Sequence, residues 1–588
     1  MEPTDRDYDR LFNETLKSGD MFALFELTRE ALAVRPDDPF VRYLQALAMA
    51  RLGEPHAALR LYRHNRVEEL GTEDAIALRG RLLKDLAVRA SGDERIELFR
   101  QASSAYRRAY EMSAGYYSGI NAATTSLLAG DTATASELAA TIAKRPDIAR
   151  PGDYYAAASG AEATLVQGRV EEAAALFEAA RRRPDASPGL LASTARQVQL
   201  IVDQLAIPAQ QREALLHIVR PTPVIHFCGH MFQAGWDAEA ELAASIRSIL
   251  DETDVRIAYG PLACGADILV AEAVLERGGE LHAVLPFAED DFVATSVSVG
   301  GPEWLPRYER VKAAASDLVF ATQMRWVDDD QQFAYCSRLV MGLTQLRASV
   351  MQAEVFQLAV WDGVPATGVA GTGADVAAWK ELGGVTRIVP VPRERPPLAP
   401  VALVHKQTEA RWALCSMLFA DFAGFSRLDE DRLSQFLQVV MGRIAKVLDR
   451  HGEAVLSRNS WGDAVFAVIR SPSEAAHIAV EIQRELSPEL LQSIGLPAEG
   501  GMRISLHHGP IFEHFDAVQG ARTFYGTEVT VAARIEPRVP VGAIYTTQPF
   551  AALIESDPNE YHFEYVGRID LAKNYGARTL YRLGIGDG

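Results

Sequence analysis

The chain has 588 residues, 48% of them hydrophobic and 23% charged, so it can build large cores and lacks the composition of a disordered protein. At roughly 150 residues per domain, this length predicts about three or four domains. The 59 Lys and Arg residues against 78 Asp and Glu give a net charge of −19, which argues against a nucleic-acid binder, since such a protein needs a basic face.

The cysteines and the apolar runs of the sequence exclude further classes of protein. The four cysteines lie far apart with no CxxC pair, so neither a disulfide framework nor a thiolate zinc site is indicated. The N-terminus is acidic, and no stretch approaches the roughly 20 apolar residues of a membrane span. We therefore expect a soluble, cytoplasmic protein that does not enter a membrane.

Residues 1–205 are predicted to be helical, because they are rich in Ala, Leu and Arg with apolar residues at helical spacing. Three glycines are each followed by a proline after sixteen or seventeen residues: Gly19 by Pro36, Gly130 by Pro146, and Gly168 by Pro184. Since Gly ends helices and Pro stops them, each interval should hold one helix of a two-helix unit. The segments LGEPHAALRLY and QGRVEEAAALFEAARRRP resemble tetratricopeptide repeats, which implies a surface for a protein partner. An ordinary helical bundle without a partner is the alternative.

Strands and helices alternate in residues 221–392, where continuous apolar strands at 224–230, 255–260 and 280–287 predict an α/β domain with a parallel sheet. The segment GPLACGADILVAEAVLERGGELHAVLPF resembles a Rossmann-like superfamily that includes the DNA-processing-A and cytokinin-riboside-hydrolase (LOG-like) proteins. That resemblance implies a nucleotide phosphate at a glycine loop formed by Gly229, Gly260, Gly265 and Asp267. The glycines can equally be tight turns. Because the hydrolases' Gly-Gly-Gly-Thr pattern is absent, a structural or regulatory role is favoured over catalysis.

A proline-rich segment over 393–410 predicts an extended linker, and residues 411–588 then form a separate domain. An apolar strand ends at Asp421, and a helix over about 430–450 follows. Its predicted apolar stripe comprises Leu433, Phe436, Leu437, Val440, Met441, Ile444 and Leu448. Gly462 and Asp463 lie between two apolar runs and predict a hairpin turn. These elements can bring Asp421 and Asp463 to one edge of a sheet, where two repelling carboxylates favour a divalent cation.

Three ordered motifs, LFADFAGFS, SWGDAVFAV and FYGTEVTVAARIE, make residues 411–583 resemble the class III nucleotide cyclases. The resemblance implies an α+β ferredoxin-like fold and a reaction in which the ribose 3′ oxygen of a nucleoside triphosphate attacks the α-phosphorus and expels pyrophosphate. It makes Asp421 and Asp463 the ligands of two Mg²⁺ or Mn²⁺ ions, Arg534 the arginine that stabilises the transition state, and Lys573 a contact to the triphosphate. The turn formed by Phe422, Ala423, Gly424 and Phe425 would offer backbone N–H groups to the β- and γ-phosphates.

Three positions depart from the family's usual residues. Asn459 stands where adenylyl cyclases usually carry a base-recognising lysine, and Thr523 falls on the partner position, usually aspartate. The glutamate and cysteine of guanylyl cyclases are absent, so ATP is favoured over GTP, while the neutral pair also leaves a pyrimidine nucleotide open. Thr530 replaces the asparagine that orients the ribose, which predicts slow catalysis or a need for activation.

In this family the site lies between two catalytic domains, so one such domain per chain implies a homodimer with two equivalent sites. The leading hypothesis is an adenylate cyclase regulated by its N-terminal domains. The alternatives are a cyclase that makes cyclic UMP or CMP in signalling or antiphage defence, a non-catalytic nucleotide sensor, and a scaffold whose repeats bind a protein.

Overall fold

The computed structural model describes residues 8–12, 21–51, 55–186, 188–351, 353–399, 411–496, 500–518, 520–555, 561–571 and 577–585. The chain divides into two compact units. The first comprises Met1–Pro221 with the short segments Met351–Ala353 and Val566–Ile569, and the second comprises Thr222–Val350, Glu354–Tyr565 and Asp570–Gly588. No helix among the described residues is long and apolar enough to cross a membrane.

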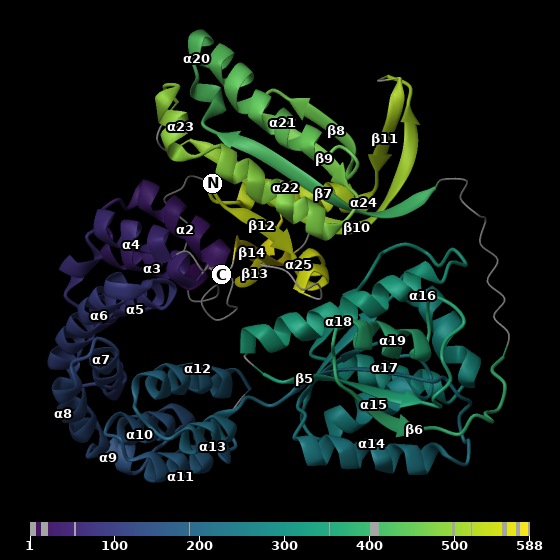
Figure 1. Cartoon of the computed structure of the whole chain (residues 1–588), viewed down its shortest axis with the longest axis horizontal. Coiled ribbons are helices and arrows are strands. Elements are labelled where there is room, and N and C mark those ends of the chain that lie inside the picture. The colour runs from purple at the N-terminus through teal and green to yellow at the C-terminus, as the bar shows by residue number, and fades with distance from the viewer. Residues whose placement is uncertain are drawn as a thin grey trace. The chain divides into compact units, whose positions relative to one another are not determined.

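The first unit is helical, as the sequence predicts, and its successive helices pack against one another along a curved row (Figure 1). Its elements are α2 (Met21–Val34), α3 (Pro39–Arg51), α4 (Pro55–His64), η2 (Val67–Leu70), α5 (Glu73–Arg89), α6 (Gly92–Ser113), α7 (Tyr116–Leu128), α8 (Thr132–Ala143), α9 (Pro146–Ala149), α10 (Tyr154–Val166), α11 (Val170–Arg181), α12 (Pro188–Gln204) and α13 (Ala209–Val219). The predicted intervals each hold one helix: α2 before Pro36, α8 between Gly130 and Pro146, and α11 between Gly168 and Pro184.

The second unit begins with a six-stranded sheet in the order β4-β3-β2-β1-β5-β6, in which every neighbouring pair is parallel. Its elements are β1 (Val224–Gly229), α14 (Glu239–Thr253), β2 (Ile257–Gly260), α15 (Ala266–Glu276), β3 (Glu280–Leu285), α16 (Glu289–Phe292), η3 (Val293–Val297), η4 (Ser298–Gly300), α17 (Trp304–Ala314), β4 (Asp317–Phe320), α18 (Gln331–Met351), β5 (Val355–Trp361), α19 (Thr372–Glu381) and β6 (Thr386–Pro390). The chain runs outward from β1 to β4 and then returns to the other side of β1. The strand order therefore reverses between β1 and β5, where sheets of this kind leave a crevice at their carboxyl ends.

The glycines of the predicted phosphate loop are packed against the chain itself. A Cβ atom added at Gly229 would lie 2.3 Å from the Cβ of Ala266, and one at Gly260 would lie 2.5 Å from the ring of Phe227. Gly265 has a φ of +91°, and its Cβ would lie 2.8 Å from Phe232. These glycines make room for neighbouring protein atoms, which is the structural role that the sequence left open beside phosphate binding.

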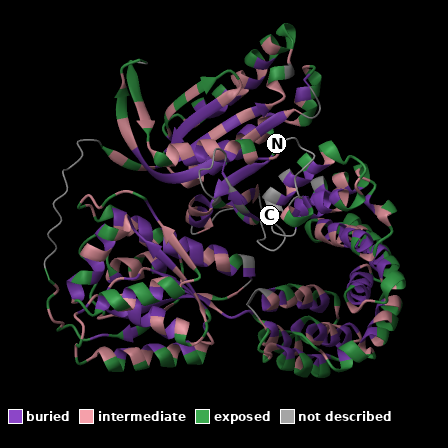
Figure 2. Cartoon of the chain, turned by 180° about the vertical axis from the view of Figure 1, so that it is seen from behind, coloured by how far each residue is buried: buried purple, intermediate pink, exposed green. Residues whose placement is uncertain are grey.

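Residues 411–585 form a mixed sheet in the order β13-β14-β12-β10-β7-β9-β8, with β11 paired to β10. Its elements are β7 (Trp412–Ala423), η5 (Phe425–Arg427), α20 (Glu430–Gln435), η6 (Phe436–Met441), α21 (Gly442–Arg450), β8 (Val455–Trp461), β9 (Ala464–Ile469), α22 (Pro472–Glu485), α23 (Pro488–Ser493), β10 (Gly501–Asp516), β11 (Ala521–Tyr525), α24 (Thr527–Ile535), η7 (Glu536–Arg538), β12 (Ile544–Thr547), α25 (Gln548–Glu555), β13 (Tyr561–Asp570) and β14 (Ala577–Ile585). Strands β9, β10 and β12 are largely buried, whereas β8 and β11 are exposed or half-buried (Figure 2). The predicted linker is described as far as residue 399; residues 400–410 lie outside the described residues.

The predicted helix over 430–450 is present, but its middle turn, η6, is a π-helix. A π-turn holds one more residue than an α-turn and so rotates the residues that follow it. Phe436, Val440 and Ile444 are buried, as predicted. Leu437 is 47% exposed, and Val447, which was not part of the predicted stripe, lies in the core. The prediction for Leu437 was therefore wrong, because it assumed a regular α-helix.

Candidate active site of the C-terminal domain

Two aspartates meet at one end of the central strands. Asp421 lies near the end of β7, and Asp463 follows Gly462 in the two-residue turn that joins β8 to β9. Because β7 and β9 are neighbours with Ala420 opposite Val465, the turn comes beside the end of β7. The two carboxyl groups are within hydrogen-bonding reach of each other. Burial, and then the charge of Asp421, raises the pKa of Asp463 to about 6.

Two further charged side chains complete the cluster. Arg503 lies directly opposite Asp421 in the β7–β10 ladder, and its guanidinium donates a hydrogen bond to the Asp421 carboxylate. The same Nη2 atom lies 3.0 Å from Oε1 of Glu536, which begins η7. Burial raises the pKa of Glu536 to about 7, although the charge of Arg503 opposes that effect. Neither residue is among those predicted from the sequence. Arg503 lies in a strand that also carries serine, histidine and acidic residues, so its charge alone does not mark it as part of a site.

The cluster has more negative than positive groups, since three carboxyls face one guanidinium. Nε of Arg503 is buried without a hydrogen-bond partner among the described residues, so the polar groups of the cluster are incompletely satisfied. Among the described residues, no three Asp, Glu, His or Cys side chains converge as a closed metal cage. Mg²⁺ is usually held by one or two carboxylates together with substrate phosphates, and Asp421 and Asp463 fit that pattern.

The turn after β7 begins later than the sequence suggested. Phe422 and Ala423 are still paired with Met502 and Gly501 of β10, and the turn starts at Gly424, which has a φ of +99°. The Phe422 side chain is buried and contacts the ring of Phe436, as does Phe425. These aromatic contacts fix the turn beside Asp421, and its backbone groups from Gly424 onward lie at the start of η5.

Helix α24 carries two more of the predicted residues. Thr530 and Arg534 are four residues apart and therefore share one face of the helix, and both are half-buried. Nε of Arg534 has no hydrogen-bond partner, and none of the described ion pairs includes this arginine. The structure thus brings Asp421 and Asp463 together, but it shows no contact between Arg534 and either of them within one chain.

A family model described as "Adenylate and Guanylate cyclase catalytic domain" matches residues 408–583, the part of the chain that contains this cluster. These residues are a class III nucleotide cyclase domain. A second model, "Tetratricopeptide Repeats-Sensor", matches residues 20–127 of the helical unit. No curated protein matches the chain.

Solved structures of cyclases align with 30% of the chain. The adenylyl cyclase CyaB from P. aeruginosa is 16% identical, with a TM-score of 0.27, and the alignment covers 30% of this chain and 96% of that one. The guanylate cyclase domain of RhGC from Catenaria anguillulae, solved in complex with GTP, is 18% identical, with a TM-score of 0.26, and the alignment covers 30% and 100%.

The two residues that the sequence predicts as base contacts, Asn459 and Thr523, lie on different elements. Asn459 of β8 is directly opposite Phe466 of β9, whose ring contacts that of Phe419 at 4.5 Å. Directly opposed residues share a face of the sheet, so Asn459 lies on the face that α24 covers. Its side-chain oxygen accepts a hydrogen bond from the N–H of Ser460 at 2.8 Å. Thr523 lies on β11, opposite His514, and no described contact joins it to Asn459.

Lys573, the remaining predicted site residue of the cyclase domain, lies outside the described residues.

Proposed function

We propose that the chain is a divalent-metal adenylate cyclase, which converts ATP to cyclic AMP and pyrophosphate. The observation that carries this proposal is the meeting of Asp421 and Asp463 in a cluster with excess negative charge. A fold kept only for its shape gains nothing from two adjoining carboxyls that repel each other, whereas a site for cations requires them.

Within one protomer, Asp421 and Asp463 would hold Mg²⁺ or Mn²⁺ ions. A divalent cation, when bound, acidifies the ribose 3′ hydroxyl and holds the phosphate oxygens in line. Arg503 pairs with Asp421, so its guanidinium would lie close enough to hydrogen-bond a phosphate oxygen of a substrate bound at these carboxylates. The backbone N–H groups after Gly424 are in position to bind the terminal phosphates.

The second half of each site would come from the partner of a homodimer. None of the ion pairs of the described residues includes Arg534, and Thr530 shares its helix face, so both would be available to a substrate held by the other protomer. There Arg534 would stabilise the charge that develops on the α-phosphate, and Thr530 would contact the ribose. Asn459 and Thr523 would contact the base, and Lys573 the triphosphate.

The product assay tests the reaction. Purified protein is incubated with each of the four ribonucleoside triphosphates and Mn²⁺ or Mg²⁺, and cyclic products are identified by mass spectrometry. We expect cyclic AMP. Cyclic UMP or CMP alone would keep the mechanism and overturn the adenylate assignment, because the neutral Asn459 and Thr523 pair accepts either class of base. Binding of nucleotide with no product from any of them would identify a sensor.

Complementation tests the shared site. Asp421→Ala and Arg534→Ala chains, each inactive alone, should recover activity when mixed, because one mixed dimer contains one intact site. We expect up to about a quarter of the wild-type activity if the chains pair at random. Recovery requires composite sites, and a mixture that stays inactive while heterodimers form would contradict them.

We further propose that the helical repeats bind a protein partner and regulate the cyclase domain. Tyr117 and Tyr155 are 53% and 55% exposed, and large exposed aromatic side chains are typical of recognition surfaces. A variant with both tyrosines changed to Ser should be as stable as the wild-type chain. The two chains should nevertheless capture different proteins.

A further inference from the structure

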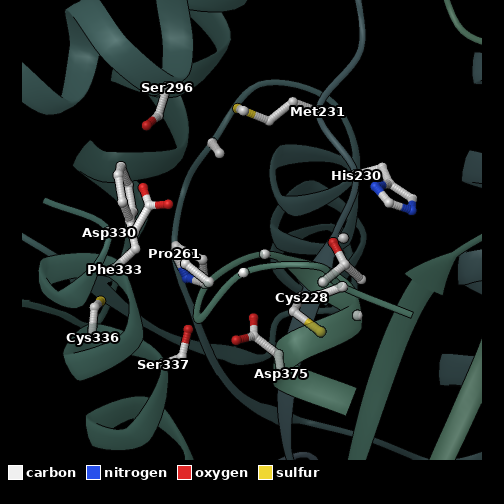
Figure 3. Close-up of a pocket in the computed structure, with 18 of the residues that line it drawn as sticks. Cys228, His230, Met231, Pro261, Ser296, Asp330, Phe333, Cys336, Ser337 and Asp375 are labelled. Carbon is white, nitrogen blue, oxygen red and sulfur yellow. The ribbon is translucent and has the colours of Figure 1, made fainter. Parts of the chain in front are cut away.

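A cavity of the α/β domain lies at the carboxyl ends of the parallel strands, at the crevice where the strand order reverses. Figure 3 shows residues that line it, among them Cys228, His230 and Asp375. The cavity has a volume of about 750 Å³. Residues after β1, β2, β3 and β5 line it, together with the start of α19 and one face of α18. Its position and size are those of a small-molecule site in open α/β sheets.

The floor of the cavity has an acid group, Asp267, with one carboxyl oxygen that lacks a hydrogen-bond partner among the described residues. Asp267 is 3% exposed, and its Oδ2 accepts a hydrogen bond from the N–H of Ala263 at 3.3 Å. Its Oδ1 is buried with no hydrogen-bond partner. Asp375, in the first turn of α19, also lines the cavity and interacts with the Ser337 hydroxyl of α18. A buried carboxyl oxygen without a partner is costly, so this floor is complementary to a hydrogen-bond donor.

The charge around the cavity selects the kind of ligand. No lysine or arginine is among the described residues that line it. His230 lines it, but its Nε2 lies 3.1 Å from Asp362, which also pairs with Arg395 at 3.0 Å, so the charge of Asp362 is already balanced. Within the described part of the chain, no ion pair includes Asp267, Asp375 or the exposed Asp330. Burial raises the pKa of Asp375 to about 7 and also raises that of Asp267, as expected where no cation compensates. A bound ammonium group would stabilise the ionised form of these carboxyls, whereas a phosphate would find no cation here.

The walls are apolar and partly aromatic. Met231, Phe292, Trp326 and Phe333 line the cavity above the acidic floor. Aromatic faces stabilise a nearby cation and also contact the apolar body of a ligand. The cavity therefore combines a place for a positively charged group with a place for a hydrocarbon or ring.

Helix α18 connects this cavity to the cyclase domain, which belongs to the same compact unit. Phe333, Cys336 and Ser337 line the cavity. On the adjoining face, the Tyr335 hydroxyl donates a hydrogen bond to the backbone carbonyl of His508 in β10 at 3.5 Å. Further along the helix, Leu346 is part of the hydrophobic core of the cyclase domain.

The β7–β10 ladder connects the contact at His508 with the candidate metal ligand Asp421. The ring of His508 is hydrogen-bonded to Ser416 of β7 at 2.9 Å, and these two residues are directly opposed. Five residues further along β7 lies Asp421, which is directly opposed to Arg503 of β10. A shift of α18 therefore acts on the two strands that hold the candidate metal ligand and its arginine.

We propose that this cavity binds a small molecule that carries an amino group on an apolar body, and that α18 transmits its binding to the cyclase domain. The binding step stands on the cavity alone, and the regulatory step rests on the proposed cyclase function. Asp267 and Asp375 hold the amino group, and the aromatic wall contacts the apolar body. Cys336 and Ser337 are the residues through which α18 contacts the bound molecule.

Binding is tested on the full chain with pairs of arylalkyl amines and arylalkyl carboxylic acids of the same skeleton, by ligand-observed NMR. We expect amines to bind and their matching acids not to bind. Asp267→Asn should weaken amine binding at least tenfold, whereas Asp290→Asn, an exposed acid outside the cavity, should leave it unchanged. If Asp267→Asn does not fold, Ala366→Trp on the exposed loop that borders the cavity should block binding instead. Equal binding of acids, no binding by any amine, or amine binding that neither variant alters would overturn the proposal.

Transmission is tested by hydrogen exchange of the full chain with and without the bound amine. We expect slower exchange in α18 and a change in β10, and Tyr335→Phe should abolish the change in β10 while amine binding persists. Unchanged exchange in β10 would overturn the regulatory step. A change in β10 in a chain that makes no cyclic product in the product assay would overturn the proposed cyclase function and its regulation, and would leave amine binding and its effect on β10 standing.

Discussion

Asp463 illustrates how a residue that a site needs can lower the stability of the fold. Its carboxyl lies beside that of Asp421, and burial and like charge both disfavour its ionised form. Such an arrangement is held in place by the rigid turn between β8 and β9 rather than by attraction between its members.

Asp463→Asn should lower the cyclase turnover by about a hundredfold or more, because an amide is a poor ligand for Mg²⁺. Without metal, the variant should melt at the same or a higher temperature than the wild type at pH 7, since one of the two repelling charges is gone. The measurements are initial rates and melting curves in the presence of a chelator. Asp431→Asn, an exposed acid in the first turn of α20, is the matched control. Retained turnover in the Asp463 variant would exclude Asp463 from the metal site.

Asp375 should give the chain a dependence of stability on pH. Its pKa rises from 3.8 to about 7 on folding, so the folded chain binds this proton more tightly than the unfolded chain. Stability from this residue is therefore lost as the pH rises from about 4 to about 7. The melting temperature of Asp375→Asn minus that of the wild type should increase over this range and level off above it. A difference that stays constant from pH 5 to pH 8 would show that Asp375 does not titrate in this way.

At the scale of elements, the π-turn η6 decides which residues of the helix over 430–450 reach the core. Leu437→Lys should change the melting temperature little, because this side chain is 47% exposed, as at other surface positions. Ile444→Ala should destabilise the cyclase domain by about 2–4 kcal/mol, because it leaves a cavity in the core. Denaturant melts of the full chain measure both, and equal effects would contradict the shift in helical phase.

The pair of aspartates could be predicted from the sequence because its signals are local. A strand that ends in an acid and a Gly-Asp hairpin need only short-range patterns, and the sheet brings the two ends together. Arg503 and Glu536 could not be found in this way, since Arg503 is 82 residues from Asp421 and meets it only through the register of β7 and β10. The π-turn likewise leaves no mark in a pattern of apolar residues.

At the scale of the whole molecule, the proposed composite site makes activity depend on association. Large apolar side chains are exposed on the cyclase domain, among them Trp461 in β8 and Phe515 in β10, each 58% exposed. We interpret them as part of the surface that meets the second protomer.

Turnover per chain should therefore rise with protein concentration and then level off. Phe515→Glu should lower the dimer fraction in sedimentation velocity and shift this rise to higher concentration. Val385→Glu, at a position in the α/β domain that is 64% exposed, should do neither. Turnover per chain that is independent of concentration, with a monomeric wild type, would contradict a shared site.

The α/β domain shows where prediction from the sequence ends at this scale. The alternation of strands and helices indicated a parallel sheet, but nothing in the pattern of α18 indicated what its two sides contact. A helix that is apolar on most sides is predicted to be buried, and the sequence does not say between which layers.

Leu346 has a practical consequence for anyone who wishes to study the catalytic part by itself. Because this leucine fills a place in the core of residues 411–585, a fragment that starts at Arg411 would lack one of its own packing groups and would expose the surrounding apolar surface to water. Such a fragment should be less soluble than one that keeps α18, and weak catalysis by it would reflect a damaged scaffold before it revealed anything about chemistry.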